Sequence, residues 1–112
     1  MPRDDDALLD ILTAAKWACA HVAGLRRADF LADVRTQDSV IRRLEIIGEA
    51  ARRISEPTRQ RLSMLPWQSM IRMRNFLIHE YDDIDLHIVW DTVQNDLPSL
   101  IAALEPLIPP ES

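Results

Sequence analysis

Three side chains in the segment 74–81 are of types that handle phosphate groups. Arg74, Asn75 and His79 supply a permanent cation, an amide and an imidazole within a short stretch of chain. Arginine forms paired hydrogen bonds to phosphate oxygens, and an imidazole exchanges protons near neutral pH. The set therefore indicates chemistry on a phosphate, with one group to hold the charge and another to move protons.

The segment that carries these residues has helical periodicity. Winding residues 67–81 at about 100° per residue gives one apolar stripe, with Arg74 in its middle, made of Trp67, Met70, Ile71, Leu77, Ile78 and Tyr81. A guanidinium at such a position is costly unless it is paired or lies at an interface. Asn75 and His79 lie one turn apart on the other side of the helix.

Arg74 and His79 do not share a face of this helix, because five residues turn it by about 140° beyond a full revolution. Two copies of the chain around a twofold axis could bring them together, with Arg74 and His79 of both copies lining one cleft. We therefore predict a homodimer with the helix 67–80 at its interface. An ion pair between Arg74 and an acid of the last helix, such as Asp91, is the alternative.

The spacing Arg-x-x-x-x-His-x-Tyr, from Arg74 to Tyr81, resembles the signature of the HEPN-domain ribonucleases, and most of all the HepT type. Further segments match that family: Arg3-Asp4, Arg35-Thr36-Gln37-Asp38, Leu44-Glu45-Ile46-Ile47-Gly48-Glu49-Ala50, Leu65-Pro66-Trp67, Asp82-Asp83-x-Asp85 and Val89-Trp90-Asp91. The resemblance covers nearly the whole chain. It implies an all-α fold, an up-and-down bundle of four to five helices, as the helical patterns also do. Residues 1–112 are expected to form one domain, and the prolines indicate a Pro-rich tail from about 106.

The resemblance also implies an activity: the toxin of a bacterial toxin–antitoxin pair, a metal-independent endoribonuclease that acts on RNA, with transfer RNA among the candidates. His79 would transfer protons, Arg74 would stabilise the pentacoordinate phosphorane, and Asn75 would orient a phosphate oxygen or the substrate. The product would be a 2′,3′-cyclic phosphate. No cofactor and no metal site are expected.

In this family, the resemblance implies, Tyr81 is adenylylated by a partner nucleotidyltransferase, the antitoxin, from ATP and Mg²⁺. A buried tyrosine with a hydrogen-bonded hydroxyl is the other interpretation of Tyr81. A different function also stays open: a non-catalytic helical partner or nucleotide-binding subunit of a nucleotidyltransferase.

Composition narrows the class of protein. The chain has 112 residues, 47% hydrophobic residues and only two glycines, which favours one helical domain with a true core. The net charge of −5 argues against broad binding to duplex nucleic acid. The charge is uneven: residues 1–74 hold all 13 basic residues and 10 acidic ones, whereas residues 75–112 hold 8 acidic residues. The acidic part could dock a basic partner.

The single cysteine, Cys19, is expected to be a buried and inert thiol, which suits a reducing cytoplasm. The start of the chain does not resemble a signal peptide, and no apolar run approaches the roughly 20 residues of a membrane span. We expect a cytoplasmic protein.

Helix signals divide the chain into four long helices, at 4–24, 36–55, 67–80 and 85–104, with a short helix near 28–31. Asp4, Asp5 and Asp6 are expected to cap the first helix, Gly24 to end it, and Pro98 to kink the last. Gly48 indicates close approach of another helix, which would fit a dimer contact.

The remaining candidates have simpler interpretations. Trp17, Trp67 and Trp90 are expected in the core rather than as base-stacking surfaces, and His21 and His87 at the surface or in packing. Glu45 and Glu49 are expected in surface ion pairs with neighbouring arginines, and the acidic run 82–85 in turn and capping roles.

Overall fold

The computed structural model describes residues 2–79 and 83–109, and within these ranges it contains helices and turns but no strand. The helices are α1 (Pro2–Val22), α2 (Arg27–Leu31), α3 (Val34–Arg53), α4 (Glu56–Arg61), α5 (Trp67–His79), α6 (Leu86–Asp91) and α7 (Leu97–Leu104). A π-helical turn, Thr92–Asp96, joins α6 to α7, and a 3₁₀ turn, Glu105–Leu107, follows α7. The predicted all-α class is confirmed.

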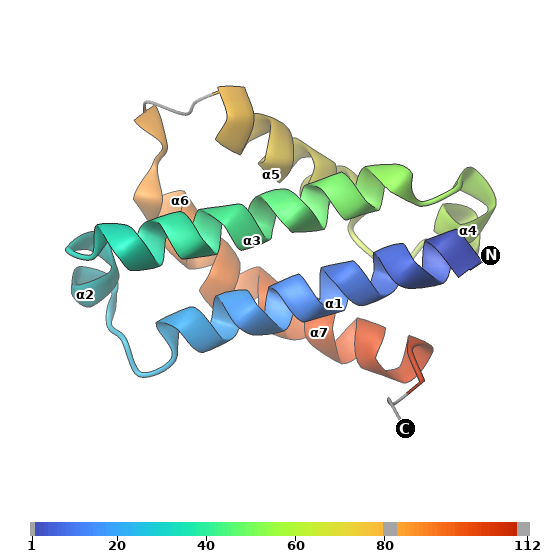
Figure 1. Cartoon of the computed structure of the whole chain (residues 1–112), viewed down its shortest axis with the longest axis horizontal. Helices are drawn as coiled ribbons and strands as arrows, with labels where there is room; N and C mark the ends of the chain where they lie inside the picture. Colours follow the sequence, from blue (N-terminus) through green and yellow to red (C-terminus); the bar gives the residue numbers. More distant parts are fainter. Residues whose placement is uncertain (1, 80–82, 110–112) are drawn as a thin grey trace.

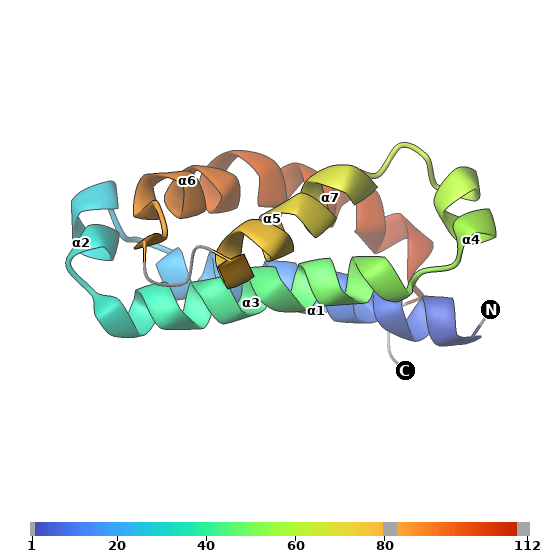
Figure 2. The ribbon, with the colours of Figure 1, turned by 90° about the horizontal axis from the view of Figure 1, so that it is seen from above.

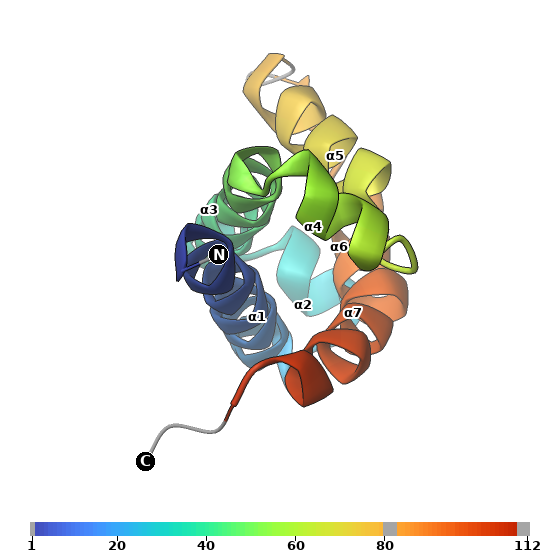
Figure 3. The same cartoon turned by 90° about the vertical axis from the view of Figure 1, so that its right-hand side faces the viewer.

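The four long helical segments, which are α1, α3, α5 and the continuous α6–α7 segment, form a bundle in two layers. α1 and α3 run side by side in one layer, and α6 and α7 form the other (Figure 2). α5 packs along the opposite edge of α3 from α1, so that α3 lies between them (Figure 1). Viewed along the bundle, the helices surround one shared core (Figure 3). This is the up-and-down arrangement that the four helical patterns predict.

Local signals account for several helix ends. Gly24 has φ of 79°, the left-handed conformation expected just beyond the end of α1. Asp33 caps α3 by accepting the Thr36 amide, so α3 begins at Val34, earlier than predicted. Asp85 caps α6 by accepting the amides of His87 and Ile88. The predicted capping role of the acidic run is thus confirmed for Asp85.

Asp4 does not cap α1, because the helix begins before it, at Pro2. Its carboxylate is instead buried, with 3% of the residue exposed, where α1 meets the start of α4. It accepts hydrogen bonds from Ser55 Oγ at 2.6 Å, Ser55 N at 3.0 Å and Thr58 Oγ1 at 2.6 Å. The bonds from Ser55, followed by that from Thr58, lower the pKa of Asp4 to about 2.

Pro98 is predicted to kink the last helix, and the structure shows a wider, π-helical turn just before it. Proline has no amide hydrogen for the preceding turn and its ring clashes with that turn. The chain responds with the π-helical turn Thr92–Asp96, in which the Leu97 amide donates to Thr92 O. α6 and α7 thereby stay one continuous rod with a local expansion.

Two of the three tryptophans lie in the core, and the third does not. Trp67 is buried and donates from Nε1 to Leu62 O at 3.0 Å. Trp90 is buried with its ring centroid 5.4 Å from that of Phe30. Trp17, however, is 51% exposed, so its predicted place in the core is wrong. Cys19 is only half-buried, and desolvation raises the pKa of its thiol.

Through residues 2–79 and 83–109, every helix is too short or too polar to cross a bilayer.

The Asp4 contacts predict a defined loss of stability in acid. The ordinary aspartate pKa is 3.8 and the folded value is about 2, so the folded state favours the charged carboxylate. This stabilisation is present above about pH 4 and is lost as the pH falls through about 2. Asp4→Asn should therefore unfold at lower urea than the wild type at pH 7, with a difference that shrinks between pH 4 and 2.

The matched control is Asp5→Asn, which removes the same charge from an exposed neighbour and should have little effect. A wild-type advantage over Asp4→Asn that stayed constant from pH 6 to 3 would contradict the ionic role.

Candidate active site

The helix that carries the phosphate-handling residues is held by a very close crossing with α3. A Cβ atom built at Gly48 would lie 2.2 Å from the Cβ of Arg74 and 2.8 Å from the carbonyl oxygen of Met70. Only a residue without a side chain therefore fits between the two helices. The close approach predicted for Gly48 is real, but the partner is α5 of the same chain, so the dimer contact predicted at Gly48 is wrong.

Arg74 leaves this crossing half-buried, with its guanidinium directed to the neighbouring amide. Arg74 Nη1 donates to Asn75 Oδ1 at 3.4 Å. Its Nε is buried, and no hydrogen-bond partner for it occurs within the described ranges. The alternative ion pair with Asp91 is not formed: Asp91 is described, and its ion-pair partner is Arg27, whose Nη2 lies 2.6 Å away. Among the described residues, no acidic side chain forms an ion pair with Arg74.

Asn75 and His79 lie on the open side of α5. Both are exposed, and His79 is the last residue of α5 that the structure describes. The structure brings Arg74 and Asn75 together, but no hydrogen bond joins His79 to either in the part of the chain that is described. A regular α5 keeps the angular divergence that the spacing predicts.

One edge of α5 is apolar and incompletely covered. Ile71 is half-buried and Ile78 is 38% exposed. Together with Arg74 they occupy positions i, i+3 and i+7, which lie on one stripe of a helix. An arginine beside an exposed isoleucine and a half-buried one is a composition found at interface surfaces.

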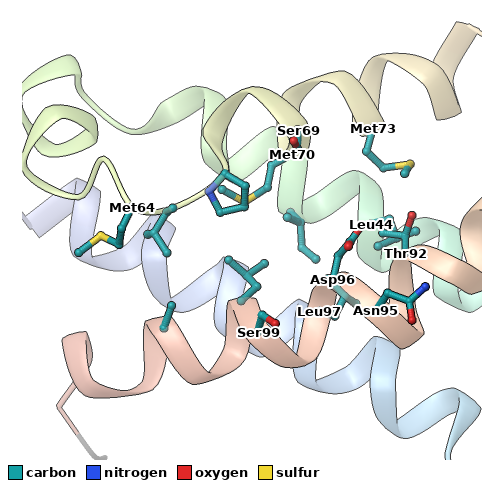
Figure 4. A pocket seen from close by; sticks show the side chains of 15 residues that line it. Leu44, Met64, Ser69, Met70, Met73, Thr92, Asn95, Asp96, Leu97 and Ser99 are labelled. Carbon is teal, nitrogen blue, oxygen red and sulfur yellow. The ribbon is translucent and has the colours of Figure 1, made fainter.

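A surface pocket lies elsewhere on the described residues. It has a volume of about 380 Å³ and is lined by α3, α5, the π turn and α7 (Figure 4). Met70 and Met73 face it from α5, and Asn95 and Asp96 from the π turn. Arg74, Asn75 and His79 do not line it. The sequence patterns did not predict this pocket, because it results from how the two layers meet.

Other candidate residues keep simple roles. Arg42 Nη1 lies 3.6 Å from Glu49 Oε1, which confirms the surface ion pair predicted for Glu49. Within the described ranges, no three His, Cys, Asp or Glu side chains are grouped as a metal site would require. The predicted modification site, Tyr81, lies outside the described residues, as do Glu80 and Asp82.

The sequence of the chain is similar to those of known proteins. The pattern of the family described as "Ribonuclease HepT-like" matches residues 11–107. A protein of Thermococcus cleftensis named "Probable ribonuclease HepT" is 47% identical over 102 residues, which are 91% of this chain and 93% of that protein. A protein of Methanocaldococcus jannaschii named "Putative RNase MJ0127" is 38% identical over 110 residues, covering 96% and 91%. No solved structure matches the chain.

The close crossing of α3 and α5 predicts how a methyl side chain at position 48 changes the stability of the fold. Alanine is favoured over glycine in a helix by roughly 1 kcal/mol, yet here its Cβ would meet a Cβ and a backbone carbonyl, neither of which yields easily. Gly48→Ala should therefore lower the free energy of unfolding in urea by about 1–3 kcal/mol. Ser39→Ala, at an exposed position of α3, is the control. If Gly48→Ala proved more stable than the wild type, the crossing would not be as rigid as described.

Proposed function

This chain belongs to the HepT-like ribonuclease family, and we propose that it is a metal-independent endoribonuclease whose active site is built from Arg74, Asn75 and His79. Membership confirms the predicted family and the enzyme class, a ribonuclease. The observation that supports the proposed site most directly is the environment of the Arg74 side chain. It is half-buried, fixed at the Gly48 crossing, in contact with Asn75, and without an ion pair in the described ranges.

The proposed reaction is transfer of the RNA phosphate to the neighbouring ribose oxygen. The 2′-oxygen attacks phosphorus as it loses its proton, and the bond to the 5′-oxygen breaks as that oxygen gains one. His79 supplies one of these proton transfers. Arg74 stabilises the negative charge that grows on the phosphorane oxygens, and Asn75 holds a phosphate oxygen or orients Arg74. The products are a 2′,3′-cyclic phosphate and a 5′-hydroxyl.

A homodimer resolves the geometry of this site. On a regular α5, Arg74 and His79 point about 140° apart, so one chain presents them in different directions. In a twofold dimer formed through the edge that holds Ile71, Arg74 and Ile78, the two copies of α5 face each other. His79 of one protomer then approaches Arg74 of its partner, and the exposed Ile78 is covered.

The biological role we propose is that of a toxin held in check by a nucleotidyltransferase antitoxin, with transfer RNA among the candidate substrates. In this scheme the Tyr81 hydroxyl attacks the α-phosphate of ATP on the partner enzyme and releases pyrophosphate. Each AMP adds a negative phosphodiester and a bulky base. Tyr81 is two residues beyond His79 in sequence, so the added phosphate would compete with RNA for Arg74.

The catalytic assignment predicts large losses from two single substitutions. His79→Ala should lower the rate of RNA cleavage by about 10²–10⁴-fold, since it removes a proton-transfer group. Arg74→Ala should cost about 10²–10³-fold, since it removes charge stabilisation. Cleavage by the wild type should persist in EDTA. His87→Ala and Arg72→Ala, at exposed positions, are the matched controls, and a fully active His79→Ala protein would refute the assignment.

Mixing the two inactive variants tests whether the dimer shares its site. In mixed dimers of His79→Ala and Arg74→Ala, one cleft would combine an intact Arg74 with an intact His79, and cleavage should return. An inactive mixture in which native mass spectrometry detects mixed dimers would contradict the shared site. A wild type that is active but monomeric by light scattering at micromolar concentration would do the same.

The regulatory role predicts a mass change on one tyrosine. Co-expression with a nucleotidyltransferase encoded beside this protein should add AMP in whole steps, located on Tyr81 by peptide mass spectrometry and absent from Tyr81→Phe. Loss of ribonuclease activity should follow the added mass. Neutralisation of the wild type without any added mass would show that the partner inhibits by binding alone.

A further inference from the structure

The exposed Trp17 is the centre of a second group of side chains, which has no role in the proposed catalytic reaction. Trp17 projects from α1 with 51% of its surface exposed. The Arg43 guanidinium carbon, from α3, lies 5.8 Å from the centre of its ring. The His21 ring, one turn further along α1, lies 5.9 Å away at an interplanar angle of 30°. Two helices thus build one aromatic and cationic surface.

The charges around this group are arranged unequally. Arg42 and Arg53, also on α3, are neutralised by Glu49 at 3.6 Å and Asp10 at 2.7 Å. Arg43 forms no such ion pair within residues 2–79 and 83–109 and contacts the Trp17 ring instead. The Nε2 atom of His21 is buried without a hydrogen-bond partner in the same ranges. This surface is therefore more than a set of solvated ion pairs such as those that Arg42 and Arg53 form.

We propose that Trp17, His21 and Arg43 form a binding site for an unpaired base of an RNA strand. Exposed aromatic rings stack on nucleobases of any sequence, and an adjacent arginine adds a cation–π contact and a partner for the flanking phosphate. The proposal rests on RNA being the substrate, and it adds a place where the strand is held outside the Arg74–His79 segment.

The position of this site suits a strand that also reaches α5. α3 lies between α1 and α5 and contacts both (Figure 1). Arg43 lies five residues before Gly48, at which α5 crosses, a rise of about 7.5 Å along the helix. A helix with its side chains is roughly 10–12 Å wide, so the path from the Trp17 ring to Arg74 crosses α3 and also runs this distance along it. A single RNA strand spans that distance within a few nucleotides.

The net charge of the chain makes base stacking important for RNA binding. At −5, the protein as a whole repels RNA, so long-range attraction to phosphates contributes little. Binding must then come from local contacts, and stacking depends only weakly on salt. The proposed site therefore predicts an RNA affinity that falls less steeply with salt than that of a basic RNA-binding protein.

The test uses the full chain carrying His79→Ala, which leaves the RNA intact, and a short single-stranded oligouridylate labelled at its end. Trp67 and Trp90 are buried, so Trp17 supplies the solvent-exposed part of the tryptophan emission. RNA should quench that part, and the quenching should vanish in Trp17→Ala. Affinity measured by fluorescence anisotropy should fall about 5- to 100-fold in Trp17→Ala and less in Trp17→Phe. Val34→Ala, an exposed apolar position of α3, is the control.

Each other outcome is informative. Equal RNA affinity in Trp17→Ala and its parent would overturn the proposal. Conversion of a dimer to a monomer by Trp17→Ala, seen by light scattering, would overturn it as well, because the surface would then join two copies of the chain. With His79 intact, Trp17→Ala should raise KM while kcat is retained. RNA binding through Trp17 by a wild type that cuts no RNA would refute the proposed catalysis and leave this site standing.

Discussion

The structure depends on the contact between α3 and α5 at Gly48. Because the two backbones approach to a distance that excludes a methyl group, the first atoms of the Arg74 side chain are fixed, and only its outer part can move. α3 also packs along α1, so this helix sets the position of the phosphate-handling segment relative to the rest of the bundle. The glycine matters here for the space it leaves, since its backbone is ordinary helix, in contrast to Gly24 with its positive φ.

Much of the fold could be predicted from the sequence because its signals are local. Gly24, Asp85 and Pro98 act on the backbone within a turn or two, and each does what its chemistry requires. Asp4 could not be placed in the same way, since its partners Ser55 and Thr58 are more than fifty residues away. Residue type alone predicts a core position for Trp17, because aromatic residues are common in cores. Helical winding in fact puts it opposite the apolar stripe of α1.

In the candidate site, too, features set by local spacing could be predicted, and features set by packing between distant segments could not. The residues and their angular relation on α5 follow from spacing alone, so the divergence of Arg74 and His79 was predictable. Which acid pairs with which base was not. Asp91 contacts Arg27 because α2 and α6 are neighbours in the bundle, and no helical pattern carries that information. The partner of Gly48 was misjudged for a related reason, since a glycine in a helix indicates a close neighbour without saying which helix it is.

The π-helical turn at Thr92–Asp96 has a consequence for comparing sequences. Such a turn holds one residue more than the α-helical turn it replaces, so it acts as a single inserted position inside an otherwise continuous rod. A relative without a proline at the equivalent of Pro98 can close this turn and lose that residue. Its last helix would then align with this chain only across a one-residue gap at 92–96. The gap would fall within a helix rather than in a loop, where insertions are normally sought.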